Sequence, residues 1–103
     1  MTFKSVSEIK RANVALGHHF FDADAMAFFR SRVEDGGKVY GGRYFITSEQ
    51  FEFRGEKFER RYTLRRANDD GSIETVFGQF QEHQTLSAAK DAARLAAGER
   101  ATV

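Results

Sequence analysis

The sequence predicts one α+β domain over residues 1–103, of element order ααβββα, with a three-stranded antiparallel sheet packed on helices in two layers. Three observations predict it: helical apolar spacing near both ends of the chain, alternating residues of high strand propensity in the middle, and turn residues between the segments. The length suits one modest core, and the absence of cysteine excludes a disulfide framework. We expect a core over residues 5–97 and a frayed tail over 98–103.

The first helix is predicted over residues 6–16. Ser5 followed by Glu8 fits a capping box, in which the two side chains bond to the free amides of the first turn. Apolar residues then recur at helical spacing, and Gly17 suits a left-handed C-cap.

A second helix is predicted over residues 23–34. Asp22 is a suitable N-cap, and Met26, Phe29 and Val33 recur at i, i+3 and i+7 on one face. The glycine doublet at 36–37 is expected to close this helix.

Three strands are predicted next, over residues 39–47, 60–66 and 73–80, because β-branched and aromatic residues alternate there with polar ones. The charged segment 52–59 is expected to be the turn between the first two strands, and residues 68–71, Asn-Asp-Asp-Gly, the turn between the last two. The order predicts an antiparallel meander.

The last helix is predicted over residues 86–97. Its alanines recur every three or four residues, which indicates a helix lying close against the sheet, and Gly98 provides the stop.

The formal charge is only +1, which argues against the broad basic surface of a general nucleic-acid binder. No apolar run approaches the roughly 18 residues of a membrane span, and the N-terminal segment lacks the apolar stretch of a secretion signal. We expect a soluble, cytoplasmic protein.

Histidines and carboxylates crowd around residues 18–24. His18, His19, Asp22 and the distant His83 suggest a metal site, but their spacing matches no known metal pattern, so the favoured interpretation is a packed and hydrogen-bonded helix junction. We expect no metal and no cofactor.

Acid–base candidates near the aromatic residues are His18, Asp22, Asp24 and Glu49. Nothing in the spacing fixes their geometry, and Asp22 is better explained as a helix cap and Glu49 as a charge at a strand end. We therefore expect no catalytic residue and no enzymatic activity.

The glycine doublets at 36–37 and 41–42 lie after a helix and before a strand, which is the wrong context for a phosphate loop. Residues 42–46, Gly-Arg-Tyr-Phe-Ile, are similar to a base-stacking strand of an RNA-recognition domain, but the element order differs. Nucleic-acid binding through an aromatic and basic sheet face stays open as the alternative function.

Several residues remain without a role in capping or in the core. One phenylalanine of the 28/29 pair must leave the apolar stripe, because adjacent helical residues point apart. Two arginines of the second strand are expected on its outer face, open to a charged contact. The predicted partner-binding residues are His18, His19, Phe28, Tyr40, Arg43, Arg61 and Arg65.

A longer set of motifs resembles a family of small uncharacterised proteins encoded by phages, plasmids and genomic islands. The similarity covers roughly residues 5–96, and only the charged turn at 52–59 departs from it. The motifs are GHHFF at 17–21, MxFFxSR at 26–32, YGGRYFITSE at 40–49, RYT at 61–63 and DGSI at 70–73.

The resemblance implies a setting and no catalytic residue. It suggests an accessory protein of a mobile element that binds a host protein or complex, with inhibition of a defence system such as CRISPR or restriction as one form of that role. The oligomeric state stays open between monomer and homodimer.

Overall fold

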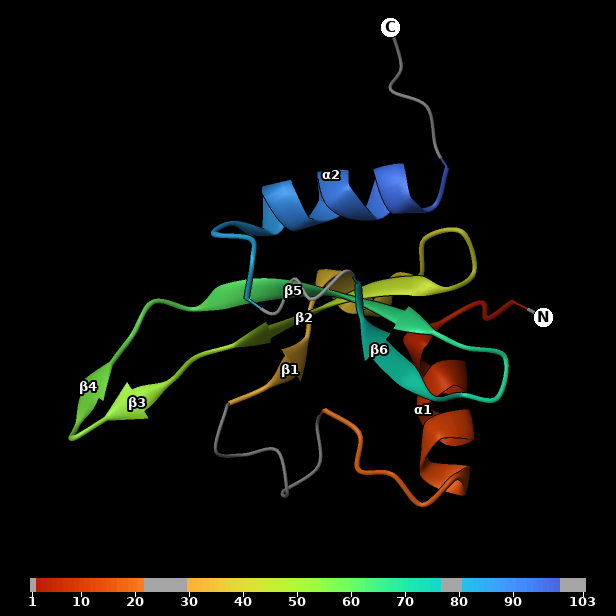
Figure 1. Ribbon diagram of the computed structural model, residues 1–103, viewed down its shortest axis with the longest axis horizontal. Helices are drawn as coiled ribbons and strands as arrows, with labels where there is room; N and C mark the ends of the chain where they lie inside the picture. The colour runs from red at the N-terminus through yellow and green to blue at the C-terminus, as the bar shows by residue number, and fades with distance from the viewer. Residues whose placement is uncertain (1, 22–29, 77–80, 99–103) are drawn as a thin grey trace, which may run out of the picture.

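The computed structural model describes residues 2–21, 30–76 and 81–98 of the chain. Two helices, α1 (Val6–Ala15) and α2 (Leu86–Ala96), flank an antiparallel sheet on opposite sides (Figure 1). The sheet contains β1 (Arg32–Val33), β2 (Tyr44–Glu49), β5 (Arg61–Ala67) and β6 (Ile73–Thr75), in the order β1-β2-β5-β6. A separate hairpin consists of β3 (Glu52–Phe53) and β4 (Glu56–Lys57), and a 3₁₀ turn, η2 (Asp35–Gly37), follows β1.

The predicted meander is confirmed, because β2 pairs with β5 and β5 pairs with β6, both antiparallel. The first strand begins later than expected, at Tyr44, since Tyr40 and Tyr44 pair with each other across a tight loop before the sheet starts. The third strand ends at Thr75, so the described Val76 lies beyond it, and residues 77–80 of the predicted span lie outside the described residues.

The end of the second predicted helix is not helical, so the order ααβββα is wrong there. Arg32 and Val33 form β1, an edge strand that pairs with β2. Arg30 has a φ of +48°, which a continuing right-handed helix does not allow. A strand of two residues leaves no alternating pattern in the sequence, so the helical spacing dominated the prediction. Residues 22–29, which include Asp22 and Phe28, lie outside the described residues.

One face of the sheet is covered by α2. Ile46 and Leu64 pack there against Ala89 and Ala93, and all four side chains are buried. The alanine stripe thus brings the helix close to the sheet, as predicted, and Thr85 caps it by accepting a hydrogen bond of 3.1 Å from the amide of Ala88.

The other face is covered in part by α1, so the predicted two-layer arrangement is also wrong. Phe45 and Ala67 of the sheet belong to one buried cluster with Val6 and Ile9 of the helix. The ring of Phe20 stacks on Phe45 with centroids 6.2 Å apart. Both sheet faces carry core residues, and the three layers are helix, sheet and helix.

The start of α1 only partly follows the capping-box prediction. Ser5 is the N-cap, but its side chain makes no capping hydrogen bond. The Glu8 carboxylate reaches back one residue further than expected and accepts from the amide of Lys4 at 3.0 Å. Gly17 follows the helix at a φ of +87°, as predicted.

The loop between Tyr40 and Tyr44 holds both ends of the described chain. A Cβ atom on Gly41 would lie 2.8 Å from the Cβ of Ala97, and one on Gly42 would lie 2.5 Å from the Cβ of Thr2. The amide of Phe3 also donates to the carbonyl of Gly42 at 2.8 Å. The two glycines therefore allow the N-terminal segment and the end of α2 to meet at one loop.

The end of α1 rests on the turn between β5 and β6. The Asn13 side chain donates to the carbonyl of Gly71 at 3.0 Å, and Asn13 is itself buried. Gly71 has a φ of +94°, and a Cβ there would approach the Cβ of Ala12 to 2.5 Å. The predicted Asn-Asp-Asp-Gly turn thus also serves as a docking point for the helix.

Gly71→Ala should therefore lower the free energy of unfolding by about 2–5 kcal/mol, because left-handed strain of about 1–2 kcal/mol adds to overpacking of about 1–3 kcal/mol. Gly17→Ala is the matched control, since Gly17 has a similar φ with nothing within 4 Å of its would-be Cβ. Urea unfolding followed by circular dichroism measures both. Equal losses in the two variants would contradict the close contact between α1 and this turn.

Candidate functional site

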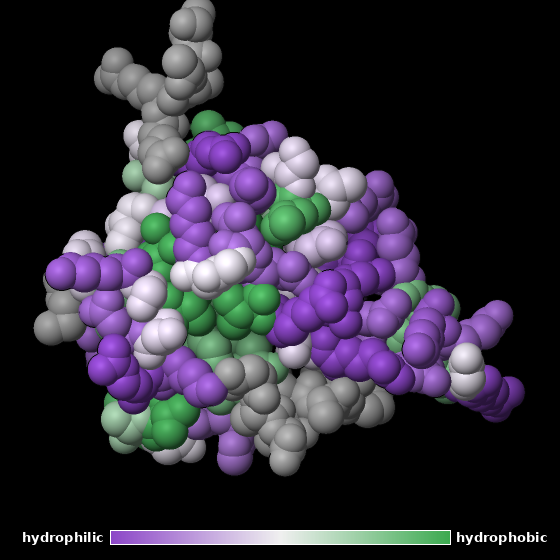
Figure 2. All heavy atoms as spheres, turned by 180° about the vertical axis from the view of Figure 1, so that it is seen from behind, coloured by the Kyte–Doolittle hydropathy of each residue, from purple (hydrophilic) through white to green (hydrophobic). Residues whose placement is uncertain are grey.

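Two large apolar side chains are exposed on the hairpin over residues 51–58, which we call the arm. Phe53 is 60% exposed and Phe58 is 52% exposed. Figure 1 shows the arm extending away from the sheet and helices at one end of the molecule, and Figure 2 shows apolar and hydrophilic residues side by side along it. Apolar groups left open on a projecting element are typical of interaction sites.

The register of the arm places its phenylalanines on a common face. Phe53 lies opposite Glu56, and the amide of Phe58 donates to the carbonyl of Phe51 at 2.8 Å. Residues directly opposite on paired strands share a face, and so do alternate residues along one strand. Phe51, Phe53 and Phe58 therefore form one aromatic face, in which Phe51 is the most buried ring.

The tip of the arm is a two-residue turn, Arg54–Gly55, and both residues have positive φ, +52° and +82°. Such a turn favours Asn-Gly, and a left-handed arginine costs about 1–2 kcal/mol. The Arg54 guanidinium lies 5.2 Å from the ring centre of Phe53. The strained turn thus keeps a cation beside an exposed ring.

The arm is anchored at its base by side chains from neighbouring segments. The Gln50 amide donates to the carbonyl of Phe58 at 3.2 Å, and Arg30 forms an ion pair with Glu52. The first contact closes the base of the arm, and the ion pair ties the arm to the segment that precedes β1.

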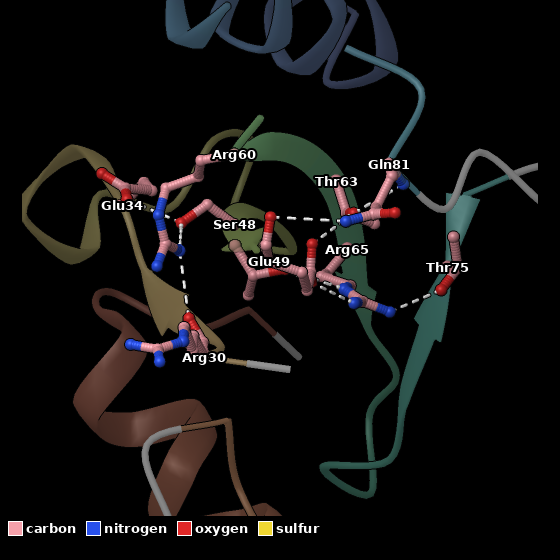
Figure 3. A network of polar contacts seen from close by, with 10 residues as sticks. Arg30, Glu34, Ser48, Glu49, Arg60, Thr63, Arg65, Thr75 and Gln81 are labelled. Atoms are coloured by element: carbon pink, nitrogen blue, oxygen red, sulfur yellow. Dashed lines mark hydrogen bonds and ion pairs between the residues drawn. The ribbon is translucent and has the colours of Figure 1, made fainter. Parts of the chain in front are cut away.

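An arginine cluster lies beside this base, centred on the buried hydroxyl of Ser48 (Figure 3). Arg60 Nη1 donates to Ser48 Oγ at 2.7 Å and to the Arg30 carbonyl at 3.0 Å. Ser48 Oγ in turn donates to Glu34 at 2.7 Å, and Arg32 Nε donates to the same carboxylate. Burial, and next the charge of Arg32, lower the pKa of Arg60. Among the residues that the structure describes, Arg60 is thus a cation whose hydrogen-bond partners are both neutral.

The arm was missed as a site because the charged segment 52–59 indicated only a turn. A usable signal was present: Phe51 and Phe53 alternate, Gly55 marks a turn, and Phe58 falls where a hairpin returns to Phe51. Whether such rings are exposed depends on tertiary cover, which the local pattern does not encode.

The predicted loop with His18 and His19 is exposed. His18 Nδ1 lies 3.3 Å from the side-chain nitrogen of Asn13, which also holds the turn at Gly71. Among the described residues, no group of three or more histidines, cysteines and carboxylates is placed to hold a metal ion.

Tyr40 was predicted to bind a partner, but it is buried in the core. Its ring lies in the cluster beneath α2, and its hydroxyl donates to Asp35 at 2.6 Å. Lys90 of α2 lies 3.6 Å from the other oxygen of Asp35, so the tyrosine helps to join the η2 turn to the helix.

Arg43 is partly exposed and holds the end of β5. It donates to the carbonyl of Ala67 at 3.3 Å and forms an ion pair with Asp69. The hydrogen bond from Arg43 lowers the pKa of Asp69.

Arg65 was expected on the outer face of its strand, exposed to a charged contact, and this exposure is wrong, because the residue is only 9% exposed. Its Nη2 lies 2.7 Å from Glu49, a carboxylate that is 1% exposed (Figure 3). Thr47 and Thr63 donate to the two oxygens of Glu49 at 3.0 and 2.9 Å, and the Arg65 guanidinium lies 4.7 Å from the ring of Phe21. The polar residues of β2 and β5 face each other, so they form a buried network.

Arg61 is only partly exposed, and its Nη2 donates to the carbonyl of Glu82 at 3.2 Å. The six predicted partner-binding residues that the structure describes therefore do not form one exposed surface. His18, His19 and Arg43 lie at the surface, Tyr40 and Arg65 are internal, and Phe28 lies outside the described residues.

Glu49→Gln should lower the free energy of unfolding by about 3–5 kcal/mol, because it leaves the buried Arg65 charge without its carboxylate. Asp91→Asn, which breaks the exposed ion pair with Arg94, is the matched control and should change stability by less than about 1 kcal/mol. Urea unfolding measures both. A Glu49→Gln variant as stable as the control would show that the buried pair contributes nothing to stability.

Arg43→Gln should raise the pKa of Asp69 toward its usual value, since the hydrogen bond that lowers it is removed. A carboxyl with a lowered folded pKa contributes stability above its unfolded pKa, and that stability is lost as pH falls through the folded pKa. The side-chain carbonyl shift of Asp69, followed by NMR from pH 2 to 6, measures the change. An identical titration in wild type and variant would contradict the pairing.

No helix in the described part of the chain is long and apolar enough to cross a membrane. The chain matches a family model, described as a family of unknown function (DUF7447), over residues 5–94. Neither a curated protein nor a solved structure is significantly similar to it. Because the match covers nearly the whole chain, the protein belongs to the DUF7447 family.

Proposed function

We propose that this protein is a non-enzymatic binding protein that engages a host protein through the aromatic face of the arm. The observation that carries the proposal is the exposure of Phe53 and Phe58 on one face of a projecting hairpin. Aromatic side chains of this kind supply most of the binding energy when they enter a pocket of a partner.

The lack of a catalytic arrangement in the described residues supports a binding role. Glu49, an acid–base candidate from the sequence, is buried and accepts hydrogen bonds from three side chains. An open hollow of about 370 Å³ at the start of α1 contains one ionisable side chain, Lys10. Its lining is Ser5, Val6, Ser7, Lys10, Phe20, Val33, Gly36 and Gly37.

The charge of the arm and its base favours a protein over a nucleic acid. Between residues 51 and 60 the three basic side chains balance three glutamates, and Glu56 lies directly opposite Phe53. A carboxylate beside the stacking ring repels phosphates. The nucleic-acid alternative also needs an open sheet face, whereas Phe45 and Arg65 are buried.

The resemblance to proteins of phages, plasmids and genomic islands supplies the setting of the proposal. We place the protein in the cytoplasm of a host cell, as an accessory protein of a mobile element that occupies a surface of a host complex. Inhibition of a defence system, of the anti-CRISPR or anti-restriction type, is the specific form that we propose.

A photocrosslinking amino acid at position 53 or 58 should capture one and the same host protein in living cells, because both side chains face the partner. Position 95 is the matched control, since Leu95 is 71% exposed and lies on α2. Mass spectrometry of the crosslinked bands identifies the captured protein.

The double substitution Phe53→Ser with Phe58→Ser should abolish binding to the captured protein while leaving the melting temperature nearly unchanged, because neither ring belongs to the core. Leu95→Ser should bind normally. Equal capture from positions 53, 58 and 95, or no capture at all, contradicts the proposal.

A further inference from the structure

We infer that Arg60 and Arg32, at the base of the arm, form a receptor for a carboxylate of the protein partner. The inference rests on the proposed function for the class of partner, whereas the receptor itself is argued from the arginine cluster.

Arg60 is held in place before any partner arrives. Its two hydrogen bonds to described residues both come from Nη1, one to Ser48 Oγ at 2.7 Å and one to the Arg30 carbonyl at 3.0 Å. Ser48 is buried and is fixed in turn by Glu34. The guanidinium therefore loses little further freedom when it binds an anion.

The opposite edge of the same guanidinium is open. Nε and Nη2 of Arg60 make no hydrogen bond within the described residues. Neither nitrogen is among the polar atoms that are buried without a partner. These two nitrogens form the fork that grips both oxygens of a carboxylate side-on. No carboxylate of the described chain occupies that fork, since Glu34 bonds to Ser48 and Arg32.

The neighbouring charge favours an anion at this fork. Arg32 is exposed, and within the described part of the chain it bonds to Glu34 through Nε alone, so its terminal nitrogens remain available there. Burial, and next the charge of Arg32, lower the pKa of Arg60, and the charges of Glu34 and Glu49 offset this lowering only in part, which leaves room for further compensation by an anion. An incoming carboxylate supplies that compensation.

A carboxylate of a protein fits this position better than a chain of phosphates. Glu52 and Glu56 are exposed on the adjacent arm and Glu59 is exposed directly after it, and these carboxylates repel an extended polyanion while tolerating one acidic group. Because Arg60 follows Phe58 by two residues, the same partner can place an apolar pocket on the aromatic face and an acidic side chain at the fork.

The test is an NMR titration of the wild-type protein, followed at the arginine Nε–Hε signals, with a hexaglutamate peptide as the probe. The Arg60 signal should shift and saturate, while that of Arg94, the control arginine on α2, should not move. Hexaglutamine, which has no charge, should shift neither signal.

Arg60→Gln should weaken binding of the hexaglutamate peptide by about tenfold. Arg60→Lys should weaken it by nearly as much, because lysine keeps the charge but lacks the two-nitrogen fork. If the Arg60→Gln variant does not fold, the titration of the wild-type protein and the Arg60→Lys variant still test the inference. The inference is overturned if hexathymidylate binds more tightly than hexaglutamate, or if the Arg60 signal does not shift with hexaglutamate. It is also overturned if inorganic phosphate alone shifts the Arg60 signal equally. The crosslinking from positions 53 and 58 is independent of these outcomes, so the two proposals fail separately.

Discussion

The buried ion pair between Glu49 and Arg65 links the two central strands of this protein. It lies on the sheet face that α1 covers only in part, where Thr47 and Thr63 complete the coordination of the carboxylate. A charge in such a place is tolerated only when its partners are fixed, so the network requires one register between β2 and β5. The edge strands, both helices and the arm are all placed relative to that register.

The network also connects to the segment that leads into α2. The Gln81 amide donates to Thr63 Oγ1 at 2.8 Å, and its side chain donates to the Glu49 carbonyl at 3.3 Å. Gln81 adopts a φ of +57° at this point, a strained conformation held by these two bonds. The polar face of the central strands thus guides the chain toward the helix on the opposite face.

The sequence was sufficient to predict the elements whose residue pattern repeats several times, such as α1, β5 and the alanine stripe of α2. It was insufficient for β1, which is too short to show a period, and for Arg65, because alternation assigns a polar residue to solvent. The burial of Arg65 follows from a match with Glu49, sixteen positions away, and local patterns contain no such pairing. The arm was not predicted as an exposed site for a similar reason. The exposure of Phe53 and Phe58 depends on whether another element covers them, and the local sequence does not determine this.

The glycine loop between Tyr40 and Tyr44 has a consequence for how the protein is extended. Thr2 and Ala97 lie against adjacent glycines, so the two ends of the described part of the chain, residues 2 and 98, lie close to the same loop. Figure 1 shows the arm at the other end of the molecule. A tag, a fluorescent label or a second domain joined directly at residue 2 or residue 98 therefore starts far from Phe53 and Phe58, and a short linker between those two residues would permit circular permutation of the described fold.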